Sequence, residues 1–259
     1  MNDRFLRTEG IVLGTVKFGE GHSIIRLLTE RHGRIDGSAF GSRKTRSRFG
    51  SSLDPFNINL FLLYKNKPGS PYRISEAEIV LHNGEIRQNL DRILIANGLV
   101  EPVILFIGDE EREKGVYVLL RDALSLLGKM EPEKAVHLHS MYDLKLLELM
   151  GYGTQDSCVR CGSAVENASL FRDPGYGFPV CKACITHDSE LVQEGAGRFI
   201  RWAMDSPLHQ ARKVRMERNT YVSVRETIAS IYGAAFGRVP QSWEQIEKLV
   251  PYSRNMERS

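Results

Sequence analysis

Four cysteines are the residues of this chain whose type and spacing point most directly to a chemical role. They form two C-x-x-C motifs, Cys158 with Cys161 and Cys181 with Cys184, separated by 19 residues in CVRCGSAVENASLFRDPGYGFPVCKAC. Two such turns can surround a tetrahedral Zn²⁺ with Zn–S distances of about 2.3 Å. Because four thiolates leave no coordination position open for a substrate, the spacing predicts one structural zinc ion.

A redox-active C-x-x-C is the alternative interpretation of these pairs. Redox motifs usually occur singly at the start of a helix in a βαβ pattern, whereas this chain has two motifs and no such pattern around them. Disulfides are not expected, because we expect a cytoplasmic chain whose thiols stay reduced. His187, three residues after Cys184, is a further potential ligand.

Motifs for catalysis are absent from the sequence. It has no G-x-x-x-x-G-K-[ST] loop, no G-x-G-x-x-G, no H-E-x-x-H and no G-x-S-x-G. His137 and His139 stand two apart on a predicted helix and so point to different faces. Glu110 and Glu111 lie in GDEEREKG, residues 108–115, which we expect to be a solvated connection. The chain is therefore expected to be a binding protein and not an enzyme.

A cationic segment, GSRKTRSRFG at residues 41–50, is the second feature that indicates a function. It has four positive and no acidic residues and lies between predicted strands. Loops of OB-fold barrels use Lys and Arg to follow a phosphate backbone while aromatic rings stack on bases. The candidate DNA-binding residues in and near this segment are Arg31, Arg34, Arg43, Lys44, Arg46, Arg48, Lys65, Lys67 and Arg73. Phe40, Phe49, Tyr64 and Tyr72 are candidates either for stacking or for the core. Such binding should depend strongly on salt and little on base sequence.

A second basic stretch, HQARKVRMERNTYVSVR at residues 209–225, contains a single acidic residue, Glu217. Its candidate contact residues are Arg212, Lys213, Arg215 and Arg218, and Arg225 closes the stretch. A second nucleic-acid contact surface and an ordinary solvated face both fit this composition.

Charge is distributed unevenly along the chain. Residues 1–80 hold 13 Lys and Arg against 8 Asp and Glu, residues 81–150 hold 8 against 12, and residues 151–259 hold 14 against 12. This asymmetry favours a polyanionic partner for the amino-terminal part. The hydrophobic fraction of 42% is that of an ordinary globular protein. The chain has no signal-peptide pattern and no apolar run of about 18 residues, so we expect a cytoplasmic protein without a membrane partner.

Hydrophobic periodicity predicts an α+β multidomain fold. Short β-like runs at 10–18, 22–30, 34–40, 57–64 and 72–78 suit a small barrel, with an OB fold favoured over an SH3-like barrel. Helices are expected from about residue 86, over 113–128 and 133–150 with Gly151 as a C-cap, and over 189–204 and 220–236. The expected domains are an OB domain at 1–80, a helical domain at 81–150, an inserted four-cysteine module at 151–188, and a helical region at 189–259 that packs with 81–150.

Several segments resemble one known family. GIVLGTVKFGEGHSIIRLLTERHGRI carries a Gly-Glu-x-x-x-Ile element at Gly19, Glu20 and Ile24, and FGSRKTRSRFGSSLDPF carries Ser47-Arg48-Phe49-Gly50 before Pro55 and Phe56. LKLLELMGYG and CVRCG follow later. These segments resemble the RecO family of bacterial recombination mediators. The resemblance is specific over 8–80 and 140–185, loose over 85–135 and weak after about residue 190.

The resemblance implies an OB domain, a helical domain and a four-cysteine zinc module. It also implies binding of single- and double-stranded DNA and annealing of complementary strands without ATP. The implied partners are RecR, the C-terminal tail of the single-stranded-DNA-binding protein SSB and, indirectly, RecA. The implied setting is gap repair by the RecF pathway at the bacterial nucleoid. Two alternatives stay open: a zinc-ribbon OB protein that binds structured RNA or the ribosome, and a nucleic-acid hydrolase with a divalent-metal carboxylate cluster.

Overall fold

The structure is a computed structural model that describes residues 5–67, 69–108, 114–152, 157–165 and 170–249. The chain forms two compact units: unit 1 comprises residues 1–96 and 100–129, and unit 2 comprises residues 97–99 and 130–259. The division into four domains expected from the sequence stays a prediction. Most of the expected acidic connection at 108–115 lies outside the described residues.

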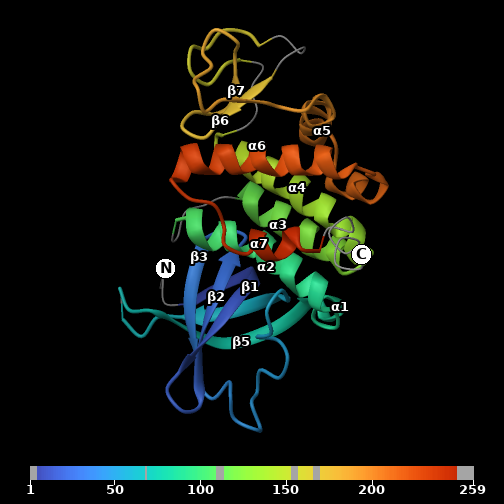
Figure 1. Ribbon diagram of the computed structural model, residues 1–259. Helices are drawn as coiled ribbons and strands as arrows, with labels where there is room; N and C mark the ends of the chain where they lie inside the picture. The colour runs from blue at the N-terminus through green and yellow to red at the C-terminus, as the bar shows by residue number, and fades with distance from the viewer. Residues whose placement is uncertain (1–4, 68, 109–113, 153–156, 166–169, 250–259) are drawn as a thin grey trace. The chain divides into compact units, whose positions relative to one another are not determined.

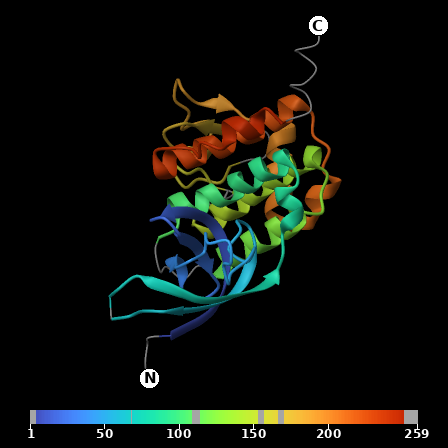
Figure 2. The same ribbon diagram turned by 90° about the horizontal axis from the view of Figure 1, so that it is seen from below.

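Unit 1 contains a closed five-stranded barrel with the strand order β1-β2-β3-β5-β4 (Figure 1). Its strands are β1 (Phe5–Phe18), β2 (His22–Thr29), β3 (Gly33–Ala39), β4 (Ile58–Tyr64) and β5 (Tyr72–Leu81). Neighbouring strands are antiparallel except β3 and β5, which are parallel. The OB-like barrel and its five predicted strands are therefore confirmed. Figure 2 shows the connection between β4 and β5, in cyan, extending away from the barrel.

Alternating side chains fill the barrel, as the period of two in the sequence requires. β3 alternates between buried and more exposed residues along its whole length. The loop between β3 and β4 adds Phe49 and Leu53 to the same core, where they join Ile25, Leu27 and Phe61. Burial of one such side chain contributes about 2 kcal/mol. The cationic segment is therefore anchored to the barrel by its own apolar residues.

Unit 1 also contains α1 (Gly84–Arg87), α2 (Leu90–Phe106) except its residues 97–99, and α3 (Lys114–Leu127). Asn89 caps α2, because its side chain accepts a hydrogen bond from the N–H of Arg92 at 3.0 Å. α3 is tied to β1, because the Tyr117 hydroxyl donates to Glu9 Oε1 at 2.5 Å. Burial, followed by this bond to Glu9, raises the pKa of Tyr117.

Unit 2 is built around α4 (Pro132–Leu149), which contacts the later helices. Gly151 follows α4 with φ of +85°, so the predicted C-cap glycine is confirmed. The remaining elements are β6 (Phe171–Asp173), β7 (Gly177–Val180), β8 (Glu190–Leu191), α5 (Glu194–Asp205), the 3₁₀-helix η1 (Leu208–Lys213), α6 (Arg218–Phe236) and α7 (Trp243–Glu247).

One local expectation for unit 2 differs from the structure. The helix expected to begin at residue 189 begins at Glu194, because Glu190 and Leu191 pair with β6 as a short strand. The side chain of Gln193 then caps α5 by accepting from the N–H of Ala196 at 2.9 Å. η1 and α7 are too short to show a helical period in the sequence. Within the described part of the chain, no helix has the length and apolar character needed to cross a membrane.

Candidate functional site

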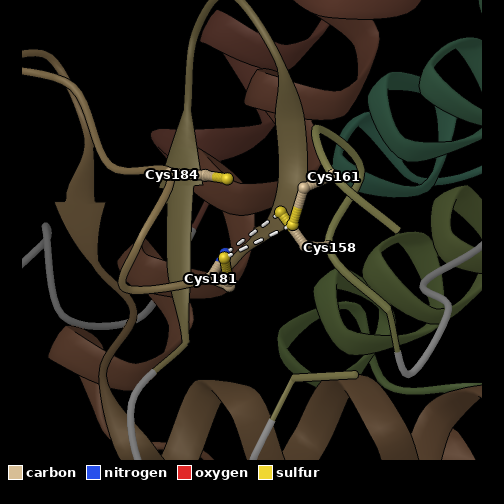
Figure 3. Close-up of side chains that lie close together, drawn as sticks. All are labelled: Cys158, Cys161, Cys181 and Cys184. Carbon is tan, nitrogen blue, oxygen red and sulfur yellow. Dashed lines mark hydrogen bonds between the residues drawn. The ribbon is translucent and has the colours of Figure 1, made fainter. Parts of the chain in front are cut away.

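The four cysteine sulfurs lie together in unit 2. The Sγ atoms of Cys158, Cys161, Cys181 and Cys184 all lie within 4.8 Å of one another (Figure 3). The sulfurs of Cys161 and Cys181 are 3.7 Å apart, and the edge of a ZnS₄ tetrahedron with Zn–S of about 2.3 Å is about 3.8 Å. Cys158 is buried, whereas Cys161 is exposed. The four thiols could therefore hold one metal ion, and the predicted ligand set is brought together.

Backbone turns shape this cluster. The N–H groups of Arg160 and Cys181 donate to Cys158 Sγ at 3.4 and 3.3 Å. The N–H of Gly162 donates to the carbonyl of Cys158, and the N–H of Cys184 donates to that of Cys181, so each C-x-x-C closes a tight turn. Amide donors aimed at sulfur stabilise a thiolate, which is the form that binds a metal.

The thiol pKa values follow these contacts. Desolvation raises the pKa of Cys158, but the N–H donors of Cys181 and Arg160 outweigh it and lower the pKa overall. The hydroxyl and N–H of Ser163 lower the pKa of Cys161 to about 6. Hydrogen bonding to Cys161 raises the pKa of Cys184 to about 12. The cluster thus contains two thiols whose pKa is lowered, Cys158 and Cys161, beside one whose pKa is raised, Cys184.

Asp173 fixes the chain around the second cysteine pair. Its Oδ2 accepts from the hydroxyls of Thr186 and Ser189, each at 2.5 Å, and its Oδ1 accepts from the N–H of Gly175 at 2.9 Å. Desolvation raises the pKa of Asp173, but the hydrogen bonds from Ser189 and Thr186 lower it overall. β6 and β7 in turn pack against α6. The cysteine module is therefore built onto the helices of unit 2. His187 points into solvent beside Asp188.

The cationic loop, defined here as residues 41–50, lies at one end of the barrel in unit 1. The N–H of Arg43 donates to the carbonyl of Gly21 at 3.3 Å, and its guanidinium donates to that of Gly19 at 3.4 Å. Arg48 donates to the carbonyl of Ile74 on β5 at 3.4 Å. The loop is therefore bonded to the β1–β2 turn and to β5. Four cationic side chains of the loop are exposed: Arg43, Lys44, Arg46 and Arg48.

The other candidate cations of unit 1 divide into two groups. Arg73 lies beside the loop, with its guanidinium 4.8 Å from the ring centroid of Phe40. Lys65 lies over the ring of Tyr72 at 4.1 Å, and Lys67 follows in the exposed β4–β5 connection. The other group, Arg31 and Arg34, lies at the opposite end of β3. Arg31 is next to Glu30, and Arg34 donates to the carbonyl of Ile104 on α2.

The candidate aromatic residues also divide. Phe49 is a core residue of the barrel and is not available to a ligand. Phe40 is exposed, and Tyr64 and Tyr72 are half-buried. His22, which was not among the residues predicted to bind DNA, joins this group, since its ring centroid lies 4.9 Å from that of Phe40. The sequence feature that could have identified His22 is the short turn at residues 19–21, because it sets the register in which His22 pairs with Phe18.

The second basic stretch exposes four of its five Lys and Arg residues, in η1, at the start of α6 and in the segment between them: Arg212, Lys213, Arg215 and Arg218. Arg225, which closes the stretch, is the exception: it is buried, so neither a contact surface nor a solvated face describes it. Its guanidinium is buried, bonds to Asp143 at 2.6 Å, and lies 4.0 Å from the ring centroid of Trp243. The charge of Arg225 is therefore paired inside unit 2 and is not presented to a ligand at the surface.

Comparison with known proteins gives one consistent result. The family model described as "Recombination protein O N terminal" matches residues 1–82, and that described as "Recombination protein O C terminal" matches residues 87–244. A protein named DNA repair protein RecO from Rubrobacter xylanophilus is 32% identical over 213 residues, covering 81% of this chain and 84% of the relative. The protein of that name from Symbiobacterium thermophilum is 26% identical over 247 residues, covering 93% and 96%. A third, from Caldanaerobacter subterraneus, is 27% identical over 214 residues, covering 82% and 85%.

Proposed function

This chain belongs to the RecO family and has a role in DNA repair and recombination, and we propose that within this role it is a recombination mediator. It binds single- and double-stranded DNA, anneals complementary single strands, and works with RecR to load RecA onto single strands coated by SSB. The SSB contact is through the C-terminal tail of SSB. The protein acts at the nucleoid in the bacterial cytoplasm.

The cationic loop is the observation that supports this proposal most strongly. Four exposed positive side chains within six residues of a loop, with no acid among them, lie at one end of an OB-like barrel. Such a loop neutralises phosphates and releases their counterions, which makes binding strong at low salt and tolerant of sequence. Arg73, Lys65 and Lys67 extend the same contact surface, and Arg31 and Arg34 remain predicted contacts at the far end of β3.

Annealing needs two strands to approach each other against their charge repulsion. The cationic loop of unit 1 and the basic surface formed by Arg212, Lys213, Arg215 and Arg218 in unit 2 each neutralise phosphates in this proposal. Neutralised phosphates repel each other less, and base pairing then supplies the specificity. No covalent bond forms or breaks on the protein, so the process requires neither ATP nor a catalytic residue.

The four cysteines hold one structural Zn²⁺ in this proposal. A set of four thiolates favours a soft or borderline metal, and a closed tetrahedral set suits zinc. The bound ion would join the two C-x-x-C turns to each other and so stabilise the cysteine module of unit 2. Phosphate contact at the cationic loop does not require the ion, because that loop lies in unit 1 and the cysteines lie in unit 2.

A strand-annealing assay tests the proposal. Complementary oligonucleotides, bare or coated with SSB, are mixed with the protein at two salt concentrations without ATP. We expect annealing that weakens at the higher salt and persists on coated strands. Absence of annealing together with binding confined to RNA would overturn the mediator role in favour of an RNA-binding protein. Nicking of the strands that stops in EDTA would instead identify a hydrolase.

A further inference from the structure

An aromatic row crosses one end of the barrel on its outer face. Phe18 on β1 is the register partner of His22 on β2. Ser23 on β2 pairs with Ala39 on β3. One residue further along the same antiparallel register, His22 lies opposite Phe40, and their ring centroids are 4.9 Å apart. Phe18 and Phe40 are 47% and 41% exposed. Three rings from three segments therefore form one outward-facing row.

The row is held in place although it is exposed. The N–H of Gly41 donates to Nδ1 of His22 at 2.9 Å, which places the ring proton of that histidine at Nε2. The guanidinium of Arg73 lies 4.8 Å from the ring centroid of Phe40. Phe40 is thus bracketed by a second ring and a planar cation, and its orientation is set before any ligand arrives. Both neighbours are themselves groups on which a nucleobase can stack.

Positive charge surrounds the row. The cationic loop begins at the residue after Phe40, and its Arg43 is bonded to the turn that joins Phe18 to His22. Glu20 is the one acidic residue of the sequence between residues 15 and 25. Exposed aromatic residues next to a phosphate-binding loop match the chemistry of single-stranded DNA, which presents bases and phosphates together. In a duplex the base faces are covered by their neighbours.

We propose that Phe18, His22 and Phe40 form a base-stacking surface that binds unpaired bases while the cationic loop holds the adjacent phosphates. This inference rests on the proposed function, because it assumes that DNA binds at this end of the barrel. It goes further by proposing that three named rings bind single strands more tightly than duplexes. It also separates two contributions: the loop supplies a salt-dependent contact and the rings supply a salt-independent one.

A thermodynamic cycle between rings and bases tests the proposal. The affinity of the full chain is measured for an oligothymidylate of about 16 nucleotides, the upper site size of one OB fold, and for an abasic strand of equal length. Phe18→Leu with Phe40→Leu keeps the apolar volume but removes the ring faces. We expect this double variant to lose about tenfold per ring on thymidylate and to match the wild type on the abasic strand. Phe40→Trp should keep or strengthen the thymidylate affinity.

Val80→Ala is the matched control, because Val80 is an exposed apolar residue of β5 outside the row and should bind both strands as the wild type does. Equal losses on the two strands would overturn the proposal, because the rings would then act through the fold. Unchanged affinity in the leucine variant, with weakened binding when Arg43, Lys44 and Arg46 become alanine, would overturn the stacking surface and leave the proposed function standing. Unchanged affinity in both variants would show that DNA does not bind at this end of the barrel.

Discussion

Arg225 on α6 lies 2.6 Å from Asp143 on α4, from Nη1 to Oδ2, and both side chains are buried in unit 2. Burial raises the pKa of Asp143 to about 6, and the nearby Arg225 counteracts that rise. The guanidinium also stacks on Trp243 of α7. One ion pair therefore joins α4 and α6, and its arginine also contacts α7 through the ring of Trp243.

Replacement of Arg225 by methionine should destabilise the protein strongly. The substitution leaves Asp143 buried without its cation, and loss of one partner of a buried pair costs about 3 kcal/mol. Asp143→Leu combined with Arg225→Met should cost less than the sum of the single changes, because no uncompensated charge remains. The measurement is urea unfolding. Arg212→Met, at an exposed cation, is the control and should stay within about 0.5 kcal/mol of the wild type. Equal effects of the two arginine variants would contradict the assignment.

Acid should weaken the fold through His137. Burial lowers the pKa of His137 to about 4, whereas an unfolded histidine has a pKa near 6.5. The unfolded chain therefore binds more protons between these values, and the stability that His137 contributes above pH 6.5 is lost as the pH falls toward 4. Asp143 has the opposite sign, because its raised pKa adds stability as the pH falls through about 6.

A comparison with His137→Gln isolates the contribution of His137 to the pH dependence of stability, because Asp143 and the buried His139 are present in both proteins. Between pH 7 and pH 5 the wild type should lose about 2 kcal/mol of unfolding free energy more than the variant. The readout is urea unfolding at each pH. Between pH 7 and pH 8.5 the difference between the two proteins should stay constant, which serves as the control. Parallel profiles from pH 7 to pH 5 would show that His137 titrates normally.

Cys158→Ser should remove the metal and lower the melting temperature. Cys158 is the buried sulfur of the cluster and accepts two amide hydrogen bonds, so its loss opens the tetrahedral set. A loss of roughly 3 kcal/mol corresponds to about 6–12 °C in a chain of this size. Metal content is measured by elemental analysis and Tm by calorimetry. His187→Ala, at the exposed histidine near Cys184, should retain both values. A serine variant with full metal content would exclude the four-sulfur site.

Replacement of Arg43, Lys44 and Arg46 by alanine should flatten the salt dependence of DNA binding. Each lost phosphate contact on a single strand lowers the slope of log Kd against log salt by about 0.7, so three contacts lower it by about 2. Arg48 is left intact because it bonds to β5. The control replaces three exposed lysines outside the loop, Lys114, Lys129 and Lys134, and removes the same charge. If both triple variants reduced the slope equally, net charge and not the loop would determine binding.

Local patterns in the sequence predicted much of the fold. Short runs rich in branched and aromatic residues located the five strands, and the C-x-x-C spacing identified the four sulfurs that the structure brings together. Charge composition could not tell exposed cations from engaged ones, because partners such as Asp143 for Arg225 and the Ile104 carbonyl for Arg34 lie far away in the sequence. Phe49 was ambiguous for the same reason, since only the folded loop shows that its ring enters the core.

The aromatic row could not be found from composition, because it depends on cross-strand register. Phe18 and His22 are close in the sequence, but Phe40 joins them only through the pairing of β2 with β3. Arg73 joins through the pairing of β3 with β5. A single-residue slip in any of these pairings would turn the corresponding side chain to the other face.

The parallel junction between β3 and β5 consists of two residue pairs, Gly37 with Tyr72 and Ser38 with Arg73, whereas seven pairs join β2 to β3. Gly37 permits this junction, since a Cβ there would lie 3.0 Å from the side chain of Ile74. Short ladders open most easily in native-state fluctuations, so amide protons along this junction should exchange with solvent sooner than those of β2. Arg73 belongs to the junction and also contacts Phe40. A ligand that binds only the closed barrel would slow this exchange. The exchange rate of the amide protons between β3 and β5 therefore shows whether a ligand is bound to the barrel.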